Sequence, residues 1–312
     1  MKIVIMGTGG MGGYYGGLLA AHGQEVTFIA RGDHLNAIRK NGLQVKSIHG
    51  DLEVKPANAT DKPAEIGPVD LVLFCTKTYH TEAAAKAIQP IVGAQTAIVS
   101  LQNGVDSAER IGSVVGTQHM LAGATWISSF VESPGVIKQV STFRRIVVGE
   151  MDGSTSPRLQ AVYEAFKPTG IAIEISDNIL KVLWTKFVFI AAVSSFGSLT
   201  RLPMGDYRAV PETRAQITRL MREVKDLAAA HAVQLDADVV EKSIKFIDDN
   251  QPHIKPSMQV DVEAGRRTEL ESMIGVIGRK GAKKGIPTPV ADFVYASLLP
   301  IELKAHPASP AA

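Results

Sequence analysis

The sequence predicts a protein of the α/β class, with a mostly parallel sheet covered by helices in the N-terminal half and an all-helical C-terminal half. In the first half, short runs rich in β-branched residues alternate with helical patterns. Beyond residues 171–175, apolar residues recur with helical periodicity and almost no strand-like alternation. A chain of 312 residues is also longer than one hydrophobic core usually organises. We therefore expect one domain over residues 1–176, a second over 177–305 and a flexible tail over 306–312.

The first half opens with a strand, a helix and a second strand. Its clearest strands are predicted at residues 2–6, 25–30, 71–75 and 97–101. Five apolar side chains recur at helical spacing between the first two strands: Met11, Tyr14, Tyr15, Leu18 and Leu19. Residues 43–48 and 52–55, separated by His49-Gly50-Asp51, predict a hairpin that adds to the same sheet. Further strands are expected at residues 120–127, 136–140, 145–148 and 171–175, with a helix near 156–166.

The second half is predicted to contain several amphipathic helices. One of them should run over residues 258–284 and end at Gly285, with Pro287 beyond it, because glycine is the residue type that most often terminates helices. Four cations lie close before that glycine: Arg279, Lys280, Lys283 and Lys284. Cations at the C-terminal end of a helix interact favourably with its dipole, so this cluster indicates a solvated helix end and not a nucleic-acid surface.

The bulk composition is that of an ordinary globular enzyme. Hydrophobic residues make up 45% of the chain, charged residues 21%, and the formal net charge is +2, so no highly charged partner is implied. Cys75 is the only cysteine and lies in an apolar run, which excludes a disulfide framework or a thiolate metal cage within the chain and favours the cytoplasm. The apolar stretch 182–193 contains Lys186 and falls short of the roughly 20 residues that cross a bilayer. We therefore expect no membrane association.

A glycine-rich loop follows the first strand. Gly7-Thr8-Gly9-Gly10-Met11-Gly12 has the spacing G-x-G-x-x-G between a strand and an amphipathic helix. Gly7 permits the tight turn, Gly9 lets the backbone approach a pyrophosphate, and Gly12 lets the helix pack against the strand. Free N–H groups at the start of the helix favour phosphates. The loop predicts a Rossmann-type dinucleotide-binding domain in which these six residues contact the nucleotide.

Two basic residues bear on the choice of nucleotide. The second strand ends at Ala30-Arg31, where an acidic residue is expected when the ribose 2′-hydroxyl of NAD is bound. Arg31 can instead bind a 2′-phosphate in a bidentate manner, which favours NADPH, although Asp33 could still serve a ribose. Lys77 follows the strand at residues 71–75 and is either a second cation beside the nucleotide or a surface lysine.

Lys186 is the candidate proton donor. Reduction of a ketone by hydride needs a group that neutralises the oxygen as negative charge develops, and a buried lysine can be tuned for that task. Lys186 interrupts the apolar runs 182–184 and 187–190, so we expect its ammonium to be partly desolvated. The alternative is a lysine that snorkels from the edge of a helix.

Glu269 and Asn103 are candidate partners of this lysine. On an unbroken helix over residues 258–284, Glu269 would share a face with Val262 and Met273, which is an unusual place for a carboxylate. It could hold Lys186 protonated or accept a hydrogen bond from a substrate, or it could simply pair with a neighbouring arginine. Asn103 follows the strand 97–101, where it faces a nicotinamide or only forms an Asn-Gly turn. The eight histidines show no metal-ligand spacing, and G-x-S-x-G is absent from the sequence, so a metal or serine hydrolase is not expected.

Several segments together resemble the ketopantoate reductase (2-dehydropantoate 2-reductase) family. In the first half these are the glycine loop, Arg31, Lys77 in Cys75-Thr76-Lys77, and Gln102-Asn103-Gly104. In the second half, Trp184-Thr185-Lys186-Phe187 resembles the family's catalytic lysine segment. The segments 257–261 and 265–270 are similar to its most recognisable helix. The resemblance spans nearly the whole chain.

The resemblance implies a fold, a reaction and a set of site residues. It implies an all-helical C-terminal domain of the kind shared with 6-phosphogluconate dehydrogenase, and reduction of 2-dehydropantoate to pantoate by NADPH. Lys186 would act as general acid, with Glu269 and Ser257 in contact with the substrate. Asn103 would order the nicotinamide and substrate side, while Arg31 and Lys77 would bind the NADPH phosphate.

The chain departs from the family at three positions. One and two helical turns after the lysine the family has substrate-binding asparagines, whereas this chain has Ile190 and Ser194. A third family asparagine corresponds to Met204. Each lost hydrogen bond is worth about 0.5–1.5 kcal/mol, so a pocket for a different, less polar 2-keto acid is the first alternative, with Ser194 still available to a substrate. The second alternative is a non-enzymatic NADPH-binding regulator. Gly275 and Gly278 would permit close packing of helices, either across a homodimer interface or within one chain, so a homodimer is one interpretation of them.

Overall fold

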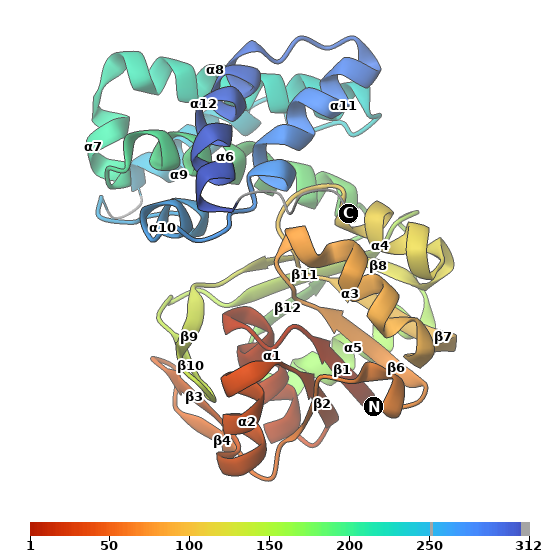
Figure 1. Cartoon of the computed structure of the whole chain (residues 1–312). Helices are drawn as coiled ribbons and strands as arrows, with labels where there is room; N and C mark the ends of the chain where they lie inside the picture. Colours follow the sequence, from red (N-terminus) through yellow and green to blue (C-terminus); the bar gives the residue numbers. More distant parts are fainter. Residues whose placement is uncertain (250–251, 307–312) are drawn as a thin grey trace, which may run out of the picture. The chain divides into compact units, whose positions relative to one another are not determined.

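The protein divides into two compact units, which a computed structural model describes over residues 1–249 and 252–306 (Figure 1). Unit 1 consists of Met1–Gln102 and Ser107–Ile179. Unit 2 consists of Asn103–Asp106 and the described residues from Leu180 onward. The short loop Asn103–Asp106 therefore leaves unit 1 and returns to it, and its side chains pack within unit 2.

Unit 1 is built on an eight-stranded sheet in the order β12-β11-β8-β7-β6-β1-β2-β5. In chain order its strands are β1 (Lys2–Met6), β2 (Glu25–Ile29), β5 (Asn58–Thr60), β6 (Val69–Phe74), β7 (Val92–Ser100), β8 (Met120–Trp126), β11 (Arg145–Glu150) and β12 (Ala172–Ile175). Neighbouring strands are parallel, except that β8 and β11 are antiparallel. The predicted α/β class is confirmed, and the carboxyl ends of β1, β2, β6 and β7 lie on one edge of the sheet.

Helices cover both faces of this sheet because successive strand residues point to opposite sides. The face that carries Ile3 and Ile5 packs against α1 (Gly10–Ala21), α2 (Gly32–Asn41) and α5 (Pro157–Phe166). The face that carries Val4 and Met6 packs against α3 (Thr81–Ile88) and α4 (Ser107–Val115). Both residue sets are fully or almost fully buried, which explains the near-continuous apolar runs of the strands.

The predicted hairpin forms, but it does not extend the main sheet. β3 (Leu43–Ser47) and β4 (Leu52–Val54) pair antiparallel, with the Ser47 N–H bonded to the Asp51 carboxylate at 2.8 Å. Together with β9 (Ser129–Ser133) and β10 (Val136–Gln139) they make a separate sheet in the order β4-β3-β10-β9. The prediction was wrong because the long-range pairing of β3 with β10 leaves no local signal, while β5 takes the edge beside β2.

Unit 2 is all-helical, as predicted. Its helices are α6 (Ile179–Thr200), α7 (Met204–Ala209), α8 (Pro211–Ala230), α9 (Val239–Asp249), α10 (Ser257–Glu263), α11 (Val276–Lys284) and α12 (Pro289–Ala305). The apolar helix α6 is longer than the sequence suggested: with 22 residues and a mean hydropathy of 1.7 it has the length and composition of a membrane span. Its buried residues form the centre of the unit 2 core, among them Trp184, Phe187 and Val188, so it is a core helix.

The helix expected over residues 258–284 is interrupted. α10 ends at Glu263, where Gly265 has a φ of 62° and the Arg266 N–H bonds back to the Asp261 carbonyl at 2.9 Å. After a short extended segment, a π-helical turn at Glu271–Gly275 leads into α11. A glycine in the left-handed region ends a helix inside a periodic apolar pattern as effectively as Gly285 does at the predicted end.

Two further expectations concern α11 and the chain end. A Cβ at Gly275 would lie 2.9 Å from the Tyr295 ring, and a Cβ at Gly278 would lie 2.6 Å from an Asp292 carboxylate oxygen. Both glycines therefore accommodate α12 of the same chain, and they lend no support to the predicted homodimer. Of the predicted flexible tail, His306 follows the end of α12 and residues 307–312 lie outside the described residues.

Candidate functional site

The glycine loop of unit 1 joins β1 to α1. Gly7 has a φ of 100°, and a Cβ on it would lie 2.9 Å from the Thr76 backbone nitrogen. A Cβ at Gly12 would lie 2.2 Å from the Gly7 carbonyl oxygen, so only glycine lets α1 start this close to the strand. Gly9, by contrast, has no atom of the described structure within 4 Å of the position of a Cβ. The open side of the loop is thus at Gly9, at the N-terminus of α1, where a pyrophosphate fits.

Hydrogen bonds fix the loop to the end of β2. The Thr8 N–H and Oγ1 both bond to the Ile29 carbonyl, at 3.0 and 2.9 Å. Arg31 lies two residues further on, is exposed, and precedes the first residue of α2. Asp33 lies in the first turn of that helix. The arginine therefore lies at the same sheet edge as the glycine loop, which suits a role beside the adenosine ribose.

Gly10 and Met11 are constrained by packing as well. A Cβ at Gly10 would lie 2.4 Å from the Ser129 carbonyl oxygen at the start of β9, so a larger residue would displace that strand. The second sheet, which the sequence did not place, therefore lies against the loop. Met11 is half-buried against the unit 1 core, and its side chain contributes to packing.

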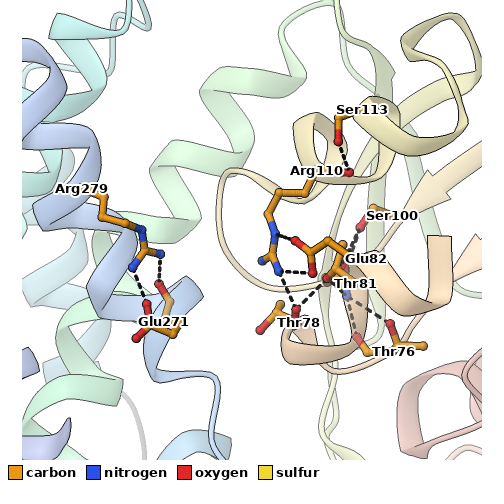
Figure 2. Close-up of polar contacts among 10 residues, drawn as sticks. Thr76, Thr78, Thr81, Glu82, Ser100, Arg110, Ser113, Glu271 and Arg279 are labelled. Atoms are coloured by element: carbon orange, nitrogen blue, oxygen red, sulfur yellow. Dashed lines mark hydrogen bonds and ion pairs between the residues drawn. The ribbon is translucent and has the colours of Figure 1, made fainter. Parts of the chain in front are cut away.

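Lys77 lies in a segment that a buried amide holds in place. The Gln102 Nε2 donates to the Thr76 carbonyl at 2.9 Å and to the Thr81 Oγ1 at 3.0 Å. The Thr81 hydroxyl donates to the Thr78 carbonyl at 2.8 Å, so the backbone is anchored on both sides of Lys77. Figure 2 shows the threonines of this network and Arg110, which also donates to the Thr78 carbonyl, at 2.9 Å, and pairs with Glu82.

Gln102 is a residue to which the sequence gave no role of its own. It is 5% exposed and lies two residues after the end of β7, so it ties that end of the strand to the segment after β6. Its neighbour Asn103 begins the loop that packs in unit 2. A polar residue at the carboxyl end of a central strand was the available signal, but only the structure shows which groups it bonds.

The lysine site of unit 2 brings together segments that are far apart in the sequence. The Lys186 Nζ donates to the Asn103 Oδ1 at 2.9 Å. Gly104, next in the loop, has a φ of 101°, and a Cβ on it would lie 3.1 Å from the Ser272 carbonyl oxygen. The loop therefore lies between α6 and the start of the π-helical turn. Asn103 accepts a hydrogen bond from the lysine and does not merely form a turn.

The surroundings of Lys186 shift its proton affinity. Trp184, Phe187 and Val188 flank it along α6 and belong to the unit 2 core. Burial of the ammonium lowers the pKa of Lys186 to about 8, and the negative charge of Glu269 partly opposes that fall. An amine with a pKa near 8 is protonated at neutral pH and still a much stronger acid than a solvated lysine.

Glu269 acts on this lysine from a different element of secondary structure than the sequence predicted. It does not lie on a continuous helix with Val262, because α10 ends at Glu263, but precedes the π-helical turn. It is 7% exposed, and its carbonyl accepts the N–H groups of Ser272 and Met273 at 3.1 and 2.9 Å. The structure thus places a buried carboxylate at the start of a helical turn, with its charge acting on Lys186.

The remaining predicted substrate residues follow the helix α6. Ile190 and Ser194 lie one and two turns after Lys186, and Ser194 is 2% exposed. At the next turn, a Cβ on Gly197 would lie 2.4 Å from the Gln259 Oε1, so α10 packs against this end of α6. Ser257, the first residue of α10, is exposed near that crossing, whereas Met204 is buried at the start of α7. Residues 1–249 and 252–306 contain no cluster of three His, Cys, Asp or Glu side chains suited to a metal ion.

Comparison with known proteins identifies the family. The family model "Ketopantoate reductase PanE/ApbA" matches residues 3–153, and its C-terminal counterpart matches residues 178–302. The chain is 30% identical to the uncharacterized oxidoreductase YkpB of Bacillus subtilis over 96% of this chain and 98% of that protein. It is 29% identical to a 2-dehydropantoate 2-reductase of Mesorhizobium japonicum, over 95% of this chain and 96% of that protein.

Solved structures agree with this result. A PanE/ApbA family ketopantoate reductase from Ralstonia eutropha superimposes with a TM-score of 0.90 and 31% identity, covering 98% of this chain and 99% of that one. The glycine loop, the helical second unit and these matches define an oxidoreductase that uses a nicotinamide nucleotide and acts on keto acids. The chain belongs to the ketopantoate reductase PanE/ApbA family.

Proposed function

We propose that this protein reduces the ketone of 2-dehydropantoate to the alcohol of pantoate with NADPH, with Lys186 as the general acid. The observation that carries the proposal is the half-buried Lys186, whose Nζ donates to the Asn103 Oδ1 at 2.9 Å and whose pKa desolvation lowers to about 8. Relatives that cover almost the whole chain at 28 and 29% identity are 2-dehydropantoate 2-reductases.

Unit 1 would bind the nucleotide. The open backbone at Gly9 and the N-terminus of α1 suit the pyrophosphate, with Thr8, Gly10 and Met11 completing the loop. Arg31 is an exposed cation where NAD-specific proteins place a carboxylate, and Lys77 adds a second cation in the anchored segment after β6. These charges favour NADPH over NADH. When bound, the nicotinamide supplies the hydride.

Unit 2 would supply the proton. As hydride adds to the ketone carbon, the electrons of the C=O bond move to oxygen, and the Lys186 ammonium gives that oxygen a proton. Glu269 keeps the lysine protonated before the step, and Asn103 orients the Nζ. Ser257, Ser194 and Glu269 are the polar groups offered to the rest of the substrate. The neutral amine then regains a proton from water.

A second candidate is a less polar 2-keto acid. Ile190 and Met204 place apolar side chains where the family has substrate-binding amides, and such a change weakens selection for a hydroxyl-bearing substrate. The same fold, at 24% identity and a TM-score of 0.90, occurs in a D-mandelate dehydrogenase solved with NADH and anilino(oxo)acetate. That protein's ligand carries an aromatic group, which gives a concrete alternative to test.

A keto-acid panel separates the two candidates. We would measure nicotinamide oxidation with 2-dehydropantoate, branched-chain 2-keto acids and phenylglyoxylate, each with NADPH and with NADH. The proposal expects the highest kcat/KM for 2-dehydropantoate with NADPH. A better branched or aromatic substrate would support the second candidate, and a preference for NADH would remove the assigned role of Arg31.

We also propose that the enzyme works in the cytoplasm, because its single cysteine is buried and unpaired.

A further inference from the structure

The last helix of the chain holds the segment that carries Glu269. The carboxylate of Glu302 on α12 accepts the Thr268 N–H at 3.1 and 3.2 Å and the Thr268 hydroxyl at 2.7 Å. The same hydroxyl accepts the Leu270 N–H at 3.2 Å. Thr268 is 7% exposed and Glu302 is half-buried, so these bonds are partly shielded from water. Glu269 thus lies between Thr268, whose N–H bonds to the Glu302 carboxylate, and Leu270, whose N–H bonds to the Thr268 hydroxyl.

A second contact between α12 and this segment lies just beyond Glu269. The Tyr295 hydroxyl donates to the Glu271 carboxylate. Figure 2 shows that this carboxylate also pairs with Arg279 of α11. The Arg279 Nη2 donates to the Glu271 carbonyl at 2.8 Å. The Glu271 side chain is 59% exposed, so its ion pair adds little energy. The Glu302–Thr268 contact is less exposed and joins one carboxylate to both the N–H and the hydroxyl of Thr268, so it is the stronger of the two anchors.

We infer that Glu302 is a positioning residue for the catalytic pair: by holding Thr268 it fixes the Glu269 carboxylate at the distance at which it acts on Lys186. The inference rests on the proposed roles of Lys186 and Glu269. A carboxylate that loses its anchor moves toward solvent, and its Coulomb interaction with a buried amine then falls steeply because the effective dielectric rises. α12 therefore takes part in the site although no residue of it has been assigned to substrate or nucleotide.

The other charged groups near Glu269 are already engaged. Arg266 bonds to the Asp261 carboxylate at 2.8 Å, and Arg279 pairs with Glu271. Arg267 precedes Thr268 in the same segment. From α6, Lys186 is the cation on which the charge of Glu269 acts. A shift of the Lys186 titration in a Glu302 variant would thus report the position of Glu269, provided that the loss of the Glu302 charge itself is controlled.

The test is an NMR titration of the Lys186 amine in the intact protein with lysine labelled at Cε, the signal being assigned from its loss in Lys186→Arg. Thr268→Val removes the hydroxyl without changing charge, and Glu302→Asp keeps the charge but shortens its reach. Both should lower the Lys186 pKa by about 0.5 or more, as should Glu302→Gln. Thr268→Ser should restore the value of the unchanged protein. Glu241→Gln, on the exposed side of α9, is the charge control and should shift nothing.

Each outcome decides the inference. An unchanged Lys186 pKa in Thr268→Val and Glu302→Asp overturns it, as does a shift confined to Glu302→Gln, which would be a direct charge effect. If Glu302→Gln does not fold, the two charge-conserving variants still decide. The shift should move the descending limb of the kcat–pH profile by the same amount while the NADPH Kd stays constant. Because the titration needs no turnover, it separates this inference from the proposed function, which fails instead if Lys186→Ala retains full keto-acid reduction.

Discussion

The nucleotide loop of unit 1 is shaped by the absence of side chains, whereas the lysine site of unit 2 is shaped by charges placed in an apolar core. At Gly7 and Gly12 any Cβ would meet backbone atoms at 2.9 Å or less, so the constraint is steric and acts within a few residues. At Lys186 the constraint is electrostatic: burial lowers the pKa of the amine, the charge of Glu269 partly opposes that fall, and Asn103 accepts a hydrogen bond from the Nζ. The glycine loop is therefore sensitive to added side-chain volume, whereas the lysine site is sensitive to changes in charge.

Loss of the lysine should produce the largest effect. Lys186→Ala is expected to lower kcat by about 100-fold or more, because the variant lacks the group proposed to protonate the ketone oxygen. The NADPH Kd should stay unchanged, since the glycine loop is intact. Stopped-flow turnover and fluorescence titration measure the two quantities. Lys181→Ala, five residues earlier on α6 and paired with Asp236 at the surface, is the matched control and should keep its activity.

The pH profile should show the lysine directly. In the folded protein burial lowers the pKa of Lys186 to about 8, from its usual value of 10.5, and the general acid must carry its proton. We therefore expect kcat to be constant below pH 8 and to fall about tenfold per pH unit above it. In Lys186→Arg the residue stays protonated, so this limb should vanish from whatever activity remains. If kcat still falls above pH 8 in that variant, the fall must be caused by the titration of another group.

Two glycine variants in the same loop, at Gly12 and Gly9, test the steric side of the comparison. Gly12→Ala should lower the free energy of unfolding by about 1–3 kcal/mol, because its Cβ would overlap the Gly7 carbonyl at 2.2 Å. Gly9→Ala meets no described atom within 4 Å and should leave that free energy within about 0.5 kcal/mol. It should nevertheless raise the NADPH Kd about tenfold, since its methyl group would occupy the pyrophosphate space. Equal unfolding midpoints and equal Kd values for the two variants would argue against this division.

The smallest expected effect concerns the nucleotide preference. Arg31→Ala should raise the NADPH Kd about fivefold and leave the NADH Kd unchanged, because only the 2′-phosphate is bound by the guanidinium. Arg39→Ala, at the other end of α2, serves as control for the loss of one surface cation. If both nucleotides weaken equally, Arg31 acts on the fold of the loop and not on the phosphate.

Local patterns gave most of the architecture. The βαβ opening, the helical second half and the end of α11 at Gly285 follow from periodicity and from residues that restrict the backbone. The continuous helix over 258–284 was a wrong prediction, because apolar periodicity continues across Gly265 and does not reveal its φ of 62°. Local patterns also could not predict the second sheet, because its β3–β10 pairing joins residues about ninety positions apart.

By itself, the sequence determined the glycine turn, the exposed Arg31 after β2 and the presence of a lysine within an apolar helix, since each is set by neighbours within a few residues. Only the tertiary structure decided that this lysine meets Asn103, 83 residues away in the chain, and that a break after α10 places Glu269 where its charge acts on the amine. Steric restrictions on the backbone are local, whereas the proton affinity of a buried group depends on every charge and apolar atom that folding brings around it.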